Sequence, residues 1–559
     1  TLHNTLFPYT TLFRSGNFAA KTTMILPKDK TGQLWSTLDT GRPGSQMTVG
    51  NFYPTVWVGN DERGFMWWSD TDKGWFPVND EPAHEVVRTA SDRSSRRKAP
   101  TEDRSRNTEN PSSVLFRNNI ISQPVELTGA RTIRFSYNAT PFRPFTKGWR
   151  MVGATEDGTF VVPHRKTRVD ANGVKVNDPQ RQKNWMHPNS TSREEWDELY
   201  AKWKKAAEAD ERRLRWRDPY SARNQIDFGH MSFALHGYGA KTIFDDLYNY
   251  FGPEWKGDTW NESYRDYAMY LMNMTFGKGG VHSTYWDITF PRQYSSPMSA
   301  LGYRLPDGRV QPEYNGWNLR RFFIRLQALA LKYDLFPNAI GVHSTNDYHL
   351  LAMPWIDAVL DGERNWNIEI SDQDWVDYYP IERMRSMSSP HNWGVPICWM
   401  ANIDGGTREE RREAKNVQAQ WIWMHDSWRN PYVRPLNQMP TSVLDWGLND
   451  DGVVYHPYWR NPHVESSDED VLVSLWQLPD RVVLGVFNYS SDKRKNVTLK
   501  VDLEALDLVP EKKWQEFVRV RDLWSGDDGP ESRLNFHARE LSVKNISPHR
   551  LRIIGIRRY

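Results

Sequence analysis

Carboxylates follow apolar stretches at two points in the middle of the chain. The stretch "STYWDITFPRQ" delivers Asp287, and "PWIDAVLDGERNW" delivers Asp361 and Glu363. An aspartate between Trp286 and Ile288 is costly to keep charged unless something specific binds it. Two such acids suit cleavage of a glycosidic bond, in which one carboxyl protonates the leaving oxygen while another stabilises the anomeric carbon or activates water. We therefore predict Asp287 as nucleophile or base, and Asp361 or Glu363 as general acid.

The residue types around these acids are those that bind sugars. Trp and Tyr offer a flat apolar face with a polar handle, which matches the C–H faces and hydroxyl rims of pyranose rings. The chain holds 27 Trp and 24 Tyr, although any single Trp is more often part of a core. The expected substrate contacts are Tyr285, Trp286, Arg292, His343, Asn346, Asp347, Trp399, Asp404, His425 and Trp428.

Each acid and the candidate histidine also has a plainer structural explanation. Asp287 would serve equally well as a structural residue that accepts hydrogen bonds from the amides of the next loop. Asp361 and Glu363 flank a glycine, and Asp-Gly is a turn signal wherever it falls. A lone histidine such as His343 is more often a satisfied hydrogen-bonding residue than a base or a metal ligand.

Helices and strands are predicted to alternate from about 151 to 440. The helical stretches are "WNESYRDYAMYLMNMTF" and "WNLRRFFIRLQALALKY", and the strands are "HMSFALHGYG", "GGVHSTYWDITF" and "NAIGVHSTND", with seventh and eighth strands in "VPICWMANIDGG" and "QWIWMHDSW". This succession implies βαβ units, a parallel sheet and a (β/α)₈ TIM barrel. Because barrel sites lie at the carboxyl ends of strands, the candidates above are the residues that this rule selects.

All-β regions are predicted on both sides of the barrel. In residues 16–150, "PTVWVGNDERGFMWWSDTDKGW" and "ARTIRFSYNATPFRPF" favour a β-sandwich whose turns "GND" and "TDKG" supply left-handed positions. Residues 441–559 contain "DVLVSLWQL", "RVVLGVFNYS", "KNVTLKVDL" and "ELSVKNISPHRLRIIGI", which favour a C-terminal antiparallel β-sandwich. An amphipathic helix is predicted after Ser192 and Glu195, which form a capping-box pattern.

The first fifteen residues are predicted not to belong to the folded protein. Residues 5–15 resemble the translation of a sequencing adapter, so the fold is expected to begin at Gly16 and the natural N-terminus to be missing. The expected domains are 16–150, 151–440 and 441–559.

Composition argues against several classes of partner. Lys plus Arg number 72 against 70 Asp plus Glu, so no strong field favours nucleic acid or anionic lipid. No apolar run reaches the ~18 residues of a membrane span. The single cysteine, Cys398, excludes an intrachain disulfide, and no metal-ligand, dinucleotide or Gly-x-Ser-x-Gly motif stands out. We expect a carbohydrate partner, no nucleic acid, no membrane insertion, no cofactor and no metal.

Several stretches resemble a known group of enzymes. "PTVWVGNDERGFMWWSDTDKGW", "STYWDITFPRQ" and "IGVHSTND…DAVLDGE" are similar to bacterial proteins neighbouring glycoside hydrolase family 123, over about residues 50 to 430. The resemblance implies a β-sandwich, a barrel and a C-terminal β-domain. Family 123 uses an adjacent Asp-Glu pair, whereas Ile288 follows Asp287 here. The spacing instead resembles retaining α-galactosidase-type barrels, which implies Asp287 as nucleophile and Asp361 or Glu363 as acid/base.

Two alternatives to a glycoside hydrolase stay open. One is a non-catalytic carbohydrate-binding protein on a degenerate hydrolase barrel. The other is a polysaccharide lyase, for which His282, His343 and Tyr285 are the candidate bases. A polysaccharide substrate makes a periplasmic or extracellular bacterial location the expectation.

Overall fold

The structure is a computed structural model that describes part of the chain. At some positions in this part it describes the backbone alone, among them 225–227, 283–286, 343, 360–361, 398 and 428–429. The described residues are 10–14, 23–26, 30–39, 52–76, 78, 80–88, 114–146, 149, 168–169, 175–176, 225–227, 262–277, 283–286, 293–294, 301–305, 308, 310–335, 340–343, 351–361, 376, 379–387, 389–399, 406–429, 446–448, 450–508, 518–525, 535–537 and 540–558.

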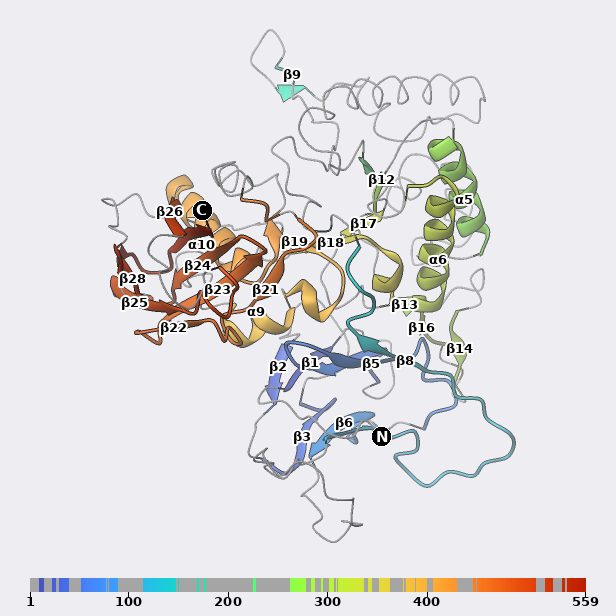
Figure 1. Ribbon diagram of the computed structural model, residues 1–559. Coiled ribbons are helices and arrows are strands. Elements are labelled where there is room, and N and C mark those ends of the chain that lie inside the picture. Colours follow the sequence, from blue (N-terminus) through green and yellow to red (C-terminus); the bar gives the residue numbers. More distant parts are fainter. Residues whose placement is uncertain are drawn as a thin grey trace, which may run out of the picture.

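Two antiparallel sheets face each other in the N-terminal region (Figure 1). The first has the order β2-β1-β4-β5-β8 and the second β3-β6-β7. Their strands are β1 (Thr10–Arg14), β2 (Thr23–Leu26), β3 (Gly32–Ser36), β4 (Thr55–Gly59), β5 (Gly64–Trp68), β6 (His84–Arg88), β7 (Val114–Asn118) and β8 (Ser136–Thr140). Trp35, Val56 and Val86 from β3, β4 and β6 share one buried cluster, which gives the predicted sandwich its core. β1 lies within the stretch set aside as adapter and pairs with both β2 and β4.

The β4–β5 hairpin turns differently from the prediction. In the "TDKG" turn, Gly74 has the expected positive φ, 91°. The "GND" turn between β4 and β5 has no left-handed residue, so the prediction of a left-handed position was wrong for this turn. Asn60 Oδ1 closes the turn instead by accepting hydrogen bonds from the amides of Glu62 and Arg63, both at 3.0 Å. Gly59 serves packing rather than turn geometry, since a Cβ there would overlap the Trp57 ring.

The central sheet consists of six parallel strands in unbroken chain order. They are β11 (Gln225–Asp227), β12 (Ser283–Trp286), β17 (Ile340–His343), β18 (Ala358–Asp361), β19 (Ile397–Trp399) and β20 (Trp428–Arg429). A doubly wound sheet reverses its strand order, whereas successive βαβ units of a barrel do not. The described strands therefore have the connectivity predicted for a barrel; closure with eight strands and the three domain boundaries stay predictions.

Helices and short strand pairs connect these strands. The helices are α5 (Glu262–Gly277), α6 (Gly316–Lys332), η3 (Met353–Trp355), α9 (Ile381–Met387), η5 (Pro390–Asn392) and α10 (Arg408–Trp423). The short pairs are β9 (Arg168–Val169) with β10 (Lys175–Val176), β13 (Gln293–Tyr294) with β16 (Glu313–Tyr314), and β14 (Tyr303–Arg304) with β15 (Val310–Gln311). The strand predicted at "HMSFALHGYG" and the helix predicted after Ser192 lie outside the described residues.

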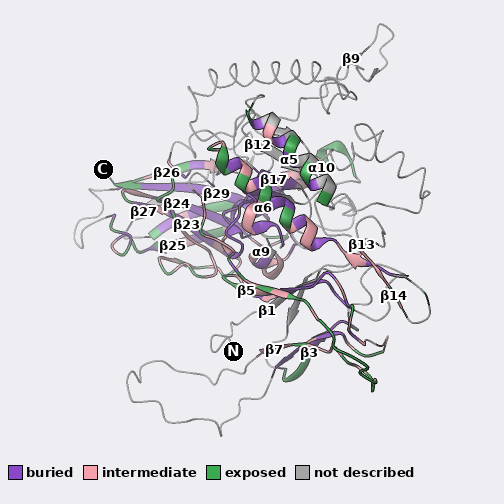
Figure 2. Ribbon diagram, turned by 90° about the vertical axis from the view of Figure 1, so that its right-hand side faces the viewer, coloured by how far each residue is buried: buried purple, intermediate pink, exposed green. Residues whose placement is uncertain are grey.

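Both predicted helices, α5 and α6, are confirmed. Leu319, Phe322 and Leu326 recur at helical spacing on α6 and are fully buried, whereas its opposite side is exposed (Figure 2). Met272 and Phe276 of α5 belong to the same buried cluster. The two helices lie side by side because each supplies an apolar stripe.

The N-terminus of α6 is capped by a residue distant in sequence. Asp70 Oδ2 accepts the Trp317 amide at 2.8 Å, whereas the side chain of the local N-cap residue, Asn315, makes no capping bond. A carboxylate there also complements the helix dipole. Gly316 admits this contact, because a Cβ would lie 2.7 Å from Asp70 Oδ1. The N-terminal region thus holds one of the helices that cover the central sheet.

The predicted eighth strand, "QWIWMHDSW", is mostly helix. Residues 420–423 end α10, a turn follows, and only Trp428–Arg429 form a strand. Thr407 and Glu410 make a capping box at the start of α10, and this signal would have located the helix. The apolar run resembles a buried strand because Trp421, Ile422 and Trp423 are all buried.

The C-terminal region is the predicted antiparallel sandwich, with sheets ordered β21-β23-β24-β29-β26 and β22-β25-β28-β27. Its strands are β21 (Val454–His456), β22 (Val464–Ser466), β23 (Val471–Leu478), β24 (Arg481–Asn488), β25 (Lys495–Val501), β26 (Val518–Ser525), β27 (Asn535–His537), β28 (Glu540–Ile546) and β29 (Leu551–Arg558). Leu484, Leu499 and Ile554 from three of these strands share its core.

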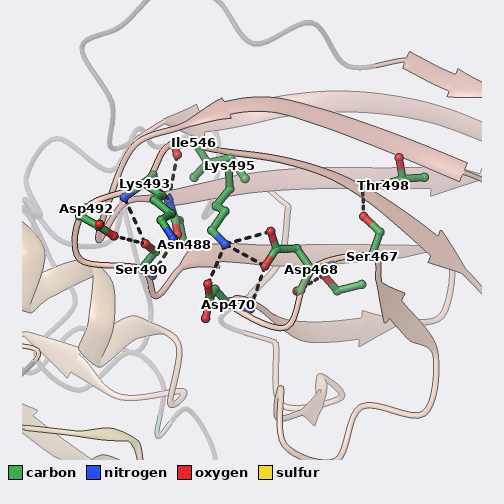
Figure 3. A network of polar contacts seen from close by, with 11 residues as sticks. Ser467, Asp468, Asp470, Asn488, Ser490, Asp492, Lys493, Lys495, Thr498 and Ile546 are labelled. Carbon is green, nitrogen blue, oxygen red and sulfur yellow. Dashed lines mark hydrogen bonds and ion pairs between the residues drawn. The ribbon is translucent and has the colours of Figure 1, made fainter.

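A lysine at the start of β25 holds the β22–β23 loop of this sandwich. Lys495 Nζ lies 3.0 Å from Asp468 and 2.6 Å from Asp470 (Figure 3). Hydrogen bonds to Asp470 and Asp468 raise the pKa of Lys495, so it stays charged. Asn488 Nδ2 donates to the carbonyls of Lys493 and Ile546 in the same network.

The tip of the β4–β5 hairpin joins all three regions. Asp61 is 8 % exposed and lies 2.7 Å from Arg385 of α9 and 2.9 Å from Arg460 of the C-terminal region. The guanidinium of Arg385 also lies over the Trp459 ring. One carboxylate therefore fastens the N-terminal sheet to both of its neighbours.

Candidate functional site

The parallel register brings several candidate positions to one edge of the central sheet. Trp286 is level with Val342 of β17, and Asp361 is level with Trp399 of β19. His343 ends β17 one residue beyond that first pair. Because the carboxyl ends of parallel strands meet at the same edge, the stretches singled out from sequence converge there. This edge is the candidate site.

The two faces of the sheet have different residues. Alternation and register place Ile340, Val342, Val359, Ile397 and Trp399 on one face, and all five belong to the cluster that includes the apolar stripes of α5 and α6. The opposite face carries positions 283, 341 and 358, which are Ser, Gly and Ala, and positions 285 and 343, which are Tyr and His. On the later strands it also carries positions 360, 398 and 428, which are Leu, Cys and Trp. The first face is helix-packed core. The second combines small residues with polar ones toward the carboxyl edge.

This alternation separates the predicted acids. Position 361 has the parity of Val359 and so belongs to the helix-packed face, whereas positions 285 and 343 belong to the other. Glu363 comes two residues after β18 ends, where strand pairing no longer dictates a face. The register therefore does not place Asp361 on the face of Tyr285 and His343.

Six of the thirteen candidate residues lie outside the described residues. These are Asp287, Arg292, Asn346, Asp347, Glu363 and Asp404. Five more are located by their backbone at strand positions: Tyr285 and Trp286 in β12, His343 in β17, Asp361 in β18 and Trp428 in β20.

His425 and Trp399 are closed to solvent. His425 is 0 % exposed, with Nδ1 bonded to the Trp421 carbonyl at 2.8 Å and Nε2 to the Tyr458 hydroxyl at 3.2 Å. Burial lowers the pKa of His425 to about 3, so it is neutral and structural. Trp399 is also fully buried and packs edge-to-face on Tyr379. Neither presents a surface to a substrate, so both are left out of the proposed site.

The amino edge of the sheet has its own polar groups, which bind the fold together. Asp357, directly before β18, is 2 % exposed; its carboxylate accepts the Ile340 amide at 2.9 Å and pairs with Arg143 at 3.4 Å. Asp426, just before β20, accepts Trp476 Nε1 and His391 Nε2, both at 2.9 Å. These carboxylates connect the sheet to the N-terminal and C-terminal regions.

A buried aspartate marks the junction with the N-terminal region. Burial raises the pKa of Asp72 to about 6, against hydrogen bonds from Tyr303 and Gln311. Those bonds measure 2.9 and 2.7 Å. Asp72 lies between the N-terminal loop and the β14–β15 pair and has a structural role.

One acid of the sheet was missed by sequence reasoning. The nearest predicted strand began at His230, whereas β11 ends at Asp227, level with Tyr285 of β12. The signal was weak because "QID" is three residues long and lacks the apolar alternation of the other strands.

The described part of the chain lacks metal-binding clusters and membrane-spanning helices. Those residues hold no group of three or more His, Cys, Asp or Glu that could bind a metal ion. None of the helices among them is long and apolar enough to cross a membrane.

No protein-family model matches this chain, and no curated protein matches it. Among solved structures, it is similar to an α-amylase of Anoxybacillus (10 % identity, 75 % of this chain and 98 % of that one, TM-score 0.37). It is also similar to an α-galactosidase from Lactobacillus brevis (11 % identity, 99 % of this chain and 74 % of that one, TM-score 0.38). A third similar structure is a maltogenic α-amylase from Thermotoga neapolitana (12 % identity, 54 % of this chain and 67 % of that one, TM-score 0.30). At these TM-scores, function has to be argued from the residues of this chain.

Proposed function

We propose that the protein is a glycoside hydrolase whose active site lies at the carboxyl edge of the central sheet. The observation that carries the proposal is the contrast between the two faces: one packs against the helices as apolar core, and the other combines small residues with Tyr285 and His343, beside Leu360 and Cys398. Small residues leave room for a ligand, and polar groups at strand ends are where barrels bind theirs.

Asp287 is the proposed nucleophile or base. It follows directly on Trp286, the last residue of β12. Continued alternation would give position 287 the parity of Tyr285, on the face with room for a sugar.

Glu363 is the better supported general acid. Asp361 is level with Trp399, whose side chain is fully buried on the helix-packed face. Glu363 lies outside the described residues, so the register does not assign it to the helix-packed face. The proposed pair is therefore Asp287 and Glu363, with Asp361 as the alternative acid.

The test is hydrolysis of a panel of poly- and oligosaccharides, followed by product chromatography. The variants are Asp287→Asn, Glu363→Gln and Asp361→Asn, with Asp266→Asn as the matched control because that aspartate is 62 % exposed on α5. We expect the first two to abolish turnover and the last two to retain it. Full activity of Asp287→Asn contradicts the assignment.

Two outcomes would replace the proposal with one of its rivals. An unsaturated product absorbing in the ultraviolet indicates a lyase, since hydrolysis forms no double bond. Binding of a glycan without turnover by the wild-type protein indicates a carbohydrate-binding protein.

A further inference from the structure

The strand β11 adds an acid to the face proposed to meet the substrate. Asp227 ends β11 and pairs in register with Tyr285, as Ile226 pairs with Thr284. Residues level across a parallel pair lie on the same face, so position 227 belongs with 285 and, through β17, with 341 and 343. Asp, Tyr and His thus stand at one edge and one face of three neighbouring strands.

The level of Asp227 along the sheet indicates its role. It is level with Tyr285 and, through β12, with Gly341, and His343 comes two residues later along β17. Two residues of strand correspond to about 6–7 Å, so position 227 lies toward the floor of the site. A sugar entering from the carboxyl edge would reach this level with the hydroxyls of its terminal ring, whereas the bond to be cleaved would stay nearer the rim.

We infer that Asp227 is a substrate-binding residue that accepts hydrogen bonds from the hydroxyls of the sugar ring held in the site. The inference rests on the proposed function, because it assigns a further residue to the same site. A carboxylate is suited to this task, since it is acceptor-only when ionised and can bind two neighbouring hydroxyls at once. Asp227 transfers no proton in the reaction.

The test compares Asp227→Asn, Asp227→Glu and the control Asp266→Asn by sugar binding and by kinetics. Glycan binding is measured by calorimetry, and thermal unfolding confirms that each variant is folded. For Asp227→Asn we expect binding at least about tenfold weaker, because hydrogen bonds to a charged group contribute about 1.5–3 kcal/mol. KM should rise, the pH dependence of kcat should keep its shape, and Asp227→Glu should recover part of the binding.

The outcomes separate this inference from the proposed function. If wild type hydrolyses a glycan and folded Asp227→Asn binds it equally well, the inference is overturned and the proposed function stands. A pH profile of kcat that loses one limb in Asp227→Asn also overturns it, because Asp227 would then be an acid or base. A wild type that binds a glycan without cleaving it, with binding lost in Asp227→Asn, supports the inference and overturns the proposed function. A wild type that neither binds nor cleaves any glycan of the panel overturns both.

Discussion

The two edges of the central sheet both carry acidic residues, but these residues have different roles. At the amino edge, Asp357 and Asp426 are buried, and each carboxylate has two hydrogen-bonding or ionic partners in other segments. At the carboxyl edge, the strands end on Asp227, His343 and Asp361. A carboxylate whose partners are protein groups stabilises the fold, whereas one left for a ligand does chemistry. Substitutions at the two edges should therefore be separable by measuring stability and turnover together.

The largest expected effect is at the carboxyl edge. Asp287→Asn should lower kcat by about 10³-fold or more, because loss of a nucleophile or base removes an interaction made in the transition state. The free energy of unfolding should stay close to wild type. Steady-state kinetics measures kcat, and chemical denaturation measures the free energy of unfolding. If Asp287→Asn mainly lowers stability, the expected difference between the two edges does not exist.

The amino edge should respond in the opposite way. Asp357→Ala removes the acceptor of the Ile340 amide and the ion-pair partner of Arg143, and breaking a buried pair costs about 3 kcal/mol. Urea unfolding should show this loss, whereas kcat per folded molecule should change little. Wild-type stability in Asp357→Ala would mean that this carboxylate does not hold the edge.

Acid should weaken the fold through His425. Its folded pKa, about 3, lies below the value of 6.5 for a free histidine, so the unfolded chain takes up the proton first. Stability should therefore fall as pH drops below 6.5, by about 2 kcal/mol at pH 5. Urea unfolding from pH 7 to 5 measures this loss, and His425→Gln should flatten it.

Two other groups contribute to the same pH profile. Burial lowers the pKa of His84 to about 4, so this histidine also makes the folded protein less stable as pH falls. Asp72 acts in the opposite direction: its pKa is raised to about 6, so its protonation stabilises the folded protein as pH falls through about 6. The difference between wild type and His425→Gln isolates the single group; an unchanged slope in the variant would contradict its assigned role.

The smallest effect is expected at the hairpin tip. Asp61→Asn removes the charge that pairs with Arg385 and Arg460, which should cost about 1–2 kcal/mol because the carboxylate is mostly buried. Thermal unfolding compares it with Glu409→Gln, whose pair with Arg412 is exposed on α10 and should contribute nothing measurable. Equal melting temperatures would place Asp61 among ordinary surface charges.

Sequence patterning by itself determined the elements whose apolar residues are periodic. The helices α5 and α6 were predicted from apolar stripes that are buried, and the strands β23, β24 and β29 from short apolar runs that are buried over most of their length. The carboxyl ends of β12 and β18 were located as places for chemistry in the same way, from short apolar runs that end in polar residues.

Tertiary structure decided what local patterns do not encode. The run "QWIWMHDSW" is apolar because the end of α10 is buried on several sides, so periodicity could not separate helix from strand. Asp70 caps a helix 247 residues away in sequence, and strand register alone assigns Asp227 to one face and Asp361 to the other. Which residues share a face depends on pairing between distant segments, and this is why sequence patterns selected candidate acids but could neither group them by face nor find Asp227.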